Sequence, residues 1–128
     1  LQLFNMHADS ATHYPDDDRT ELENVQVTYT RDPGTPWHIS ATSGLIPGGQ
    51  EIVKMTGGVT ITELEASSTP FTLNTDYLQI NTDTNLLTTD ADVRITQGNS
   101  QVTGQGLEAD LDNEWFVLNS DVQANYLR

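Results

Sequence analysis

The stretch Met55-Thr56-Gly57-Gly58-Val59-Thr60-Ile61 combines the two features that decide the fold of this chain. Its last three residues alternate apolar and polar side chains, which is the period of a half-buried strand, and the two glycines before them favour a turn. The same alternation occurs at 25–29, 37–41, 71–73, 78–80, 93–95 and 122–124. No helical period of useful length is present, so the sequence predicts an all-β protein.

The strand pattern also repeats along the chain. Valines that open a Val-x-apolar strand are spaced 34, 34 and 29 residues apart, at Val25, Val59, Val93 and Val122. Each follows a polar or glycine-containing pair that predicts a turn, namely Glu23-Asn24, Gly57-Gly58, Ala91-Asp92 and Ser120-Asp121. One hairpin cannot bury its apolar face alone, whereas stacked copies can. We therefore predict one continuous domain over residues 1–128, built from repeated hairpins.

Composition excludes several classes of function. The chain has 19 acidic and 5 basic residues and a net charge of −14, which argues against a nucleic-acid partner. It contains no cysteine, so neither a disulfide framework nor a cysteine-metal site is expected. No stretch approaches the roughly 18 apolar residues that span a bilayer. Because the chain starts at Leu1 without a charged or apolar leader, we expect that an upstream signal peptide or anchor has been removed.

No arrangement of residues indicates catalysis, a cofactor or a metal. Nucleophile elbows, zinc helices and nucleotide loops are missing from the sequence. His7, His13 and His38 lack metal-ligand spacing, and we interpret them as surface residues. The acidic run 16–18 and the pair Asp90 and Asp92 are better explained as solvated turns than as cation sites. We therefore expect a protein that is not an enzyme and binds no cofactor.

Several motifs, taken together in their order, resemble the LptC family, whose members are inner-membrane-anchored periplasmic proteins of lipopolysaccharide export. These motifs are Thr35-Pro36-Trp37-His38-Ile39-Ser40-Ala41, then Gly44, then the stretch 55–61, with Phe4-x-x-x-Ala8, Tyr14, Leu22-x-x-Val25, the threonine-rich segment 87–93 and Val122-x-x-x-Tyr126. They cover nearly the whole chain. The resemblance implies a twisted β-jellyroll of two antiparallel sheets with a hydrophobic groove.

The resemblance also implies a function and partners. The protein would accept lipopolysaccharide from an inner-membrane ABC transporter at its N-terminal edge and pass it to an LptA-like bridge protein at its C-terminal edge. It would lie in the periplasm, anchored to the inner membrane in the full-length protein. Alternatives are a soluble LptA-like bridge protein, a structural β-repeat that assembles through strand edges, and a carbohydrate-active jellyroll. Homodimer formation is left open.

Candidate site residues follow from the alternating pattern and from this family's groove. Burying one methylene is worth about 0.8 kcal/mol, so a groove that binds acyl chains needs apolar side chains rather than ion pairs. From the pattern alone, the inward-facing residues could equally fill a closed core. The resemblance favours the interpretation that they line a lipid-binding groove. The groove residues are predicted to be Leu22, Val25, Val27, Ile39, Val59, Ile61, Leu73, Val93, Ile95, Phe116, Leu118 and Tyr126.

Within this set, Leu22, Phe116 and Tyr126 are the best candidates for lipid contact, whereas Trp37 is expected to anchor the core. The C-terminal strand has no proline and little charge, so its edge is open to strand addition. The residues of this partner edge are Asp121, Val122, Gln123, Ala124 and Asn125. For Gly57-Gly58 we favour a turn over a bulge, and for Gly104-x-Gly106 both remain open.

Overall fold

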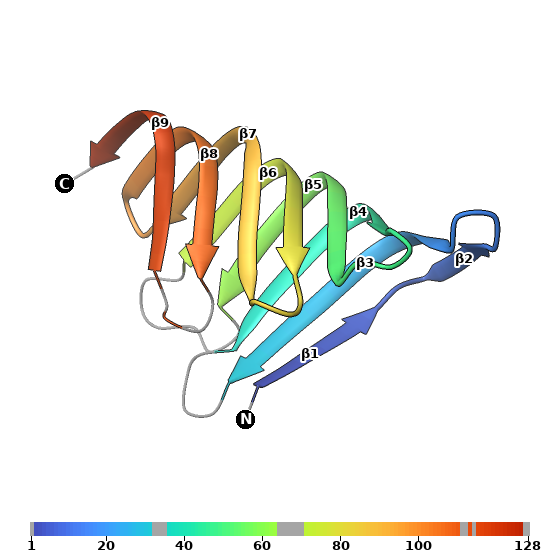
Figure 1. Ribbon diagram of the computed structural model, residues 1–128. Helices are drawn as coiled ribbons and strands as arrows, with labels where there is room; N and C mark the ends of the chain where they lie inside the picture. The colour runs from blue at the N-terminus through green and yellow to red at the C-terminus, as the bar shows by residue number, and fades with distance from the viewer. Residues whose placement is uncertain (1, 32–35, 64–70, 111–112, 114, 127–128) are drawn as a thin grey trace.

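The computed structural model describes residues 2–31, 36–63, 71–110, 113 and 115–126, and in these it contains strands and turns but no helix. The prediction of an all-β protein is therefore confirmed. Within the described residues, no helix is long and apolar enough to cross a bilayer. The strands, shown in Figure 1, are β1 (Gln2–His7), β2 (Ser10–Tyr14), β3 (Arg19–Arg31), β4 (Trp37–Ile46), β5 (Ile52–Glu63), β6 (Phe71–Asn81), β7 (Leu86–Gln97), β8 (Ser100–Asp110) and β9 (Trp115–Tyr126).

All neighbouring strands are antiparallel and form one sheet in the order β1-β3-β4-β5-β6-β7-β8-β9. The two short N-terminal strands pair with the two halves of β3, since residues 2–7 lie opposite 26–31 and residues 10–14 lie opposite 19–23. β1 and β2 therefore form one bent edge of the sheet, and β9 forms the other. Figure 1 shows the two chain ends at these opposite edges.

The long strands bend at aligned irregularities, which fold the sheet over onto itself. Register shifts occur at 40/43, 56/59, 75/79, 89/92 and 103/105, close to the middle of each strand pair. Figure 1 shows the strands arching over along this line. A bulge increases local twist and bends a strand, so a row of bulges bends a whole sheet. The predicted two sheets of the jellyroll are thus two halves of one continuous, twisted sheet.

We name the two halves after the short strands that pair with them. The β1 layer contains β1 and residues 25–31, 37–41, 59–63, 71–75, 92–97, 100–104 and 122–126. The β2 layer contains β2 and residues 19–23, 43–46, 52–56, 77–81, 86–90, 105–110 and 115–120.

The repeated valines mark this bend. In β3, β5 and β9 the residue before the valine has a positive φ, as in Asn24 (52°), Gly58 (58°) and Asp121 (54°). In β7, Val93 follows the irregularity at 89/92. The spacing of 34 residues therefore corresponds to two strands with their connections. Each valine lies just after the bend in every second strand, that is, in β3, β5, β7 and β9.

The prediction that the pairs before these valines are turns was wrong. Glu23-Asn24, Gly57-Gly58, Ala91-Asp92 and Ser120-Asp121 all lie inside strands, so each hairpin is longer than predicted. Tight turns and bulges both use residues that accept a positive φ, and residue type alone does not separate them. Gly106, with a φ of 80°, lies beside the β7–β8 irregularity. Turns that do connect strands lie elsewhere, as at 48–49, 82–85 and 98–99.

The core lies between the two layers. Apolar side chains from both layers form one buried cluster, whose largest fully buried members are Tyr29, Ile39, Met55, Leu78, Ile80, Leu87 and Leu107. Full burial of an aliphatic or aromatic side chain contributes roughly 1.5–3 kcal/mol, so this cluster is the main source of stability. No described buried side-chain nitrogen or oxygen lacks a hydrogen-bond partner.

Candidate functional site

An apolar cavity of about 170 Å³ lies between the two layers at the end opposite the bend. The β1 layer contributes Trp37, Ile61 and Phe71, which lie near strand ends. The β2 layer contributes the remaining lining residues, Leu87, Leu107, Ala109, Asp110, Trp115 and Phe116. We call this nine-residue cavity the mouth. Asp110 is the one charged residue among the nine.

Aromatic rings join the two layers across the mouth. The rings of Trp37 and Phe71 meet edge to face, with centroids 5.4 Å apart and planes at 88°. Phe71 in turn contacts Phe116 of the opposite layer, at 6.2 Å between centroids. Pairs of this geometry contribute about 0.5–1.5 kcal/mol beyond their burial. At the outer rim, Trp115 and Phe116 remain 42% and 49% exposed.

This arrangement is suited to burial of apolar groups rather than to catalysis. Ile61, Leu87 and Leu107 form the inner wall and belong to the packed core. Exposed aromatic residues beside an apolar cavity are typical of a site that receives an apolar partner or ligand. The chain's two tryptophans both line the mouth.

The structure separates the predicted groove residues into three groups. Ile61 and Phe116 line the mouth. Leu118 is partly buried against the core, and the others with described side chains pack against one another inside it: Leu22, Val25, Val27, Ile39, Val59, Leu73, Val93 and Ile95. The backbone of Tyr126 pairs with Ser100, but its side chain lies outside the described residues.

The sequence did not identify most of the mouth. Trp37, expected to anchor the core, packs against the core and also lines the cavity. The lining residues Phe71, Leu87, Leu107, Ala109 and Trp115 were not singled out as site residues. One signal was available in the sequence. Trp37, Phe71 and Trp115 are large aromatic residues that begin strands, half a strand away from the valines at the bend.

The predicted partner edge lies on β9, whose one neighbour among the described strands is β8. Val122 is 53% exposed, and Asp121, Gln123 and Ala124 are also exposed. The side chain of Asn125 lies outside the described residues. The edge itself is thus available for pairing, and its use by a partner remains a prediction.

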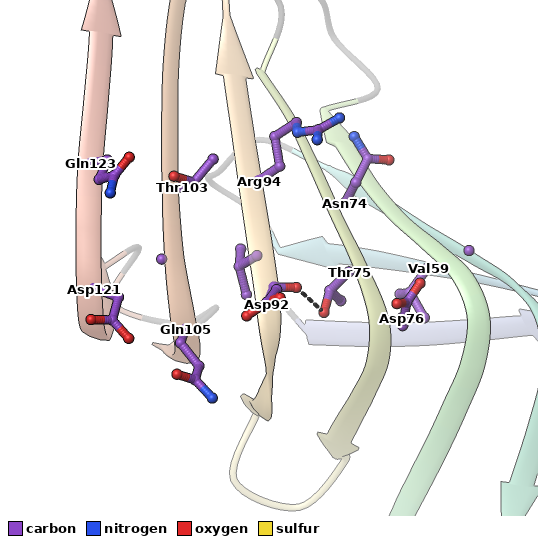
Figure 2. Close-up of a pocket in the computed structure, with 13 residues that line it drawn as sticks. Val59, Asn74, Thr75, Asp76, Asp92, Arg94, Thr103, Gln105, Asp121 and Gln123 are labelled. Carbon is purple, nitrogen blue, oxygen red and sulfur yellow. Dashed lines mark hydrogen bonds between the residues drawn. The ribbon is translucent and has the colours of Figure 1, made fainter.

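A larger, polar cavity of about 480 Å³ lies on the outer face of β5 to β9. Figure 2 shows Asn74, Arg94, Thr103 and Gln123 in a row across the strands, a row that the strand register also gives. Asp76, Asp92 and Asp121 lie on the side nearer the bend. These seven side chains are largely exposed and of mixed charge, as expected for a solvated outer face.

The acidic turn at 16–18 is held by its neighbours. Arg19 donates hydrogen bonds to Asp17, at 2.8 Å, and to Glu21, at 3.2 Å. The bond from Arg19 lowers the pKa of the Asp17 carboxyl below its usual value. His13 lies 3.0 Å from Asp18. In the part of the chain that is described, no three histidine or carboxylate side chains are grouped so that they could hold a metal ion.

Comparison with known proteins relates this geometry to a family. The sequence matches the family model described as "Lipopolysaccharide-assembly, LptC-related" over residues 3–127. No curated protein sequence matches it significantly.

Among solved structures, a similar fold occurs in LptH from Pseudomonas aeruginosa, described as the LptA homologous periplasmic component of the lipopolysaccharide transport device. The two structures align with a TM-score of 0.71 over 99% of this chain and 96% of that chain, at 12% sequence identity, which shows a shared β-jellyroll fold. Because the family match spans almost all of the sequence, the chain belongs to the LptC-related family of lipopolysaccharide-assembly proteins.

Proposed function

We propose that the protein acts in lipopolysaccharide transport as a non-enzymatic carrier that buries acyl chains between its two layers. The observation that supports this most directly is the aromatic mouth, an apolar cavity between the layers of a member of this family. Each methylene taken out of water contributes about 0.8 kcal/mol, so a lipid with several chains gains mainly from such burial. Periplasmic location, with an inner-membrane anchor in the full-length protein, is part of the same proposal.

Acyl chains longer than the mouth must displace contacts between side chains in the core. Ile61 lines the mouth and also belongs to the buried core cluster, in which most of the predicted groove residues pack against one another. If the layers separate at the end opposite the bend, the side chains of Ile39, Leu73 and Ile95 become the walls of the path. The chain would then replace contacts that the two layers now make with each other, which keeps the net cost of opening low.

The two sheet edges are the proposed partner sites. The ABC transporter would deliver lipid at the β1/β2 edge, and an LptA-like bridge protein would receive it at β9. Both edges are bent at the same line, since residues 8–9 separate β1 from β2 and β9 has a residue of positive φ at Asp121. Counting β1 and β2 as one bent strand, the sheet has an even number of strands, so a jellyroll of the same shape could continue the antiparallel pairing and the bend.

The second candidate is a structural module that assembles through its edges without carrying lipid, as a homodimer or with another partner. The packed core favours it, because most predicted groove residues are covered by one another. The soluble bridge protein remains the nearest alternative within lipopolysaccharide transport, since LptH has this fold.

Photo-crosslinking separates these candidates. The variant Phe116→benzoylphenylalanine places a reactive group at the mouth, and we expect it to capture lipopolysaccharide. The control, His38→benzoylphenylalanine, places the same group where the side chain alternates with the inward-facing Trp37 and Ile39 and thus on the outer face. We expect no capture there. Equal capture at both positions, or none at Phe116 in a folded protein, would contradict transport through the mouth.

A further inference from the structure

We propose that the mouth is a binding site for one acyl chain, and that amphiphiles with a single short chain and a neutral head bind there without separation of the layers. This inference rests on the proposed function for the class of ligand. It goes further in stating how many chains, how long a segment and what kind of headgroup the closed protein accepts.

The size of the cavity determines how long an alkyl segment the mouth can hold. The mouth, which is open to solvent on its outer side, has a volume of about 170 Å³, close to the roughly 150 Å³ of an apolar cavity that binds benzene. An alkyl segment of about six carbons therefore fills it. Ile61, Leu87 and Leu107 close its inner side and are almost fully buried in the core. Further methylenes of a longer chain must then remain outside while the layers are in contact.

Charge at the rim determines which kind of headgroup the mouth accepts. Among the described residues, Asp110 is the one charged residue that lines the mouth, and no described basic side chain does so. The whole chain carries a net charge of −14. An anionic head at the rim is therefore disfavoured relative to a neutral polyol head, which stays in water without this repulsion. A lipid with several chains can place one of them in the mouth, and the others require the layers to part.

The two tryptophans provide a reporter that is specific to this site. Trp37 and Trp115 are the only tryptophans of the chain, and they line the mouth from opposite layers. A chain that enters between them removes water from both indole rings. The intrinsic fluorescence of the protein therefore responds to occupation of the mouth rather than of another surface.

The experiment is a titration with n-alkyl glucosides from butyl to decyl, each below its critical micelle concentration, followed by tryptophan emission. We expect affinity to tighten roughly fourfold for each added methylene up to about hexyl, from the 0.8 kcal/mol that burial of a methylene contributes. From hexyl to decyl we expect no further gain. A steady gain up to decyl, or no response to any of the glucosides, would overturn the proposal.

A matched pair of variants tests the location. Ala109→Leu adds three carbons to the wall of the mouth, whereas Ala11→Leu makes the same change on exposed β2. We expect the first variant to lose hexyl glucoside binding at least tenfold and the second to bind as the parent does. An equal response of the two variants would overturn the proposal.

The result also separates this inference from the proposed function. Capture of lipopolysaccharide at Phe116 without any response to glucosides would refute the single-chain site but would support the proposed transport function. A chain-length limit near hexyl without lipopolysaccharide capture would support the single-chain site and refute transport through the mouth.

Discussion

At the residue scale, the bend of the sheet depends on a few residues with left-handed backbone. Such a conformation costs a residue with a β-carbon about 1–2 kcal/mol, and glycine avoids this cost. Gly58 and Gly106 adopt it in β5 and β8, but Asn24 and Asp121 adopt it in β3 and β9. Asn24 has compensation, since its side-chain amide donates a hydrogen bond of 2.7 Å to the Asp9 carboxylate.

Two substitutions at the bend are expected to act in opposite directions. For Gly58→Ala we expect the free energy of unfolding to fall by about 1 kcal/mol, although a β-carbon there would meet no atom within 4 Å. For Asp121→Gly we expect no loss, and a gain of up to about 1 kcal/mol, because strain is relieved at the cost of a more flexible unfolded chain. Urea denaturation followed by circular dichroism measures both. If both variants lost stability equally, the left-handed backbone would not be the cause.

At the element scale, the sequence predicted strand character well and strand length poorly. Alternation in segments such as 25–29 and 93–95 marks the residues that alternate between core and surface. Gly57-Gly58 was assigned to a turn because local residue types do not show whether the chain reverses or only bends. Ile61 and Phe116 were predicted as site residues, whereas Phe71 was not. Its contact with Phe116 arises when the sheet folds over, and no local pattern contains that information.

The partner edge gives a prediction at this scale. Val122 lies between the register pairs of β9 with Gln105 and Thr103, so it has little part in the pairing with β8. For Val122→Pro we expect loss of binding to a purified LptA-like partner, because proline fixes φ near −65° and removes an N–H from the edge. Isothermal titration calorimetry measures the affinity, and thermal unfolding confirms the fold.

The control at the same position is Val122→Thr, which keeps the N–H group and the strand propensity and should bind as the parent does. Unchanged binding by Val122→Pro would exclude this edge as the partner site.

At the scale of the whole molecule, the two layers are held together in different ways at their two ends. The backbone connects the two layers at the bend, whereas at the opposite end they meet through apolar contacts such as that of Phe71 with Phe116. Exposing even a few core residues to water costs roughly 1.5–3 kcal/mol each, so wide opening in the absence of lipid is unfavourable. The structure therefore favours opening that is driven by the entering chains, which supply the contacts that the layers lose.

This mechanism predicts that joining the layers blocks loading. The chain contains no cysteine, so Phe71→Cys and Phe116→Cys together create a unique pair at positions whose rings are now 6.2 Å apart. With a short thiol-reactive linker that contains a cleavable disulfide, we expect the joined protein to retain little lipopolysaccharide. Reductive cleavage of the linker should restore loading to the level of the unlinked double variant, which also controls for the loss of two rings. Radiolabelled lipid retained after gel filtration measures the difference. Equal loading before and after cleavage would show that lipopolysaccharide loads without separation of the layers at this end, and would contradict opening driven by the entering chains.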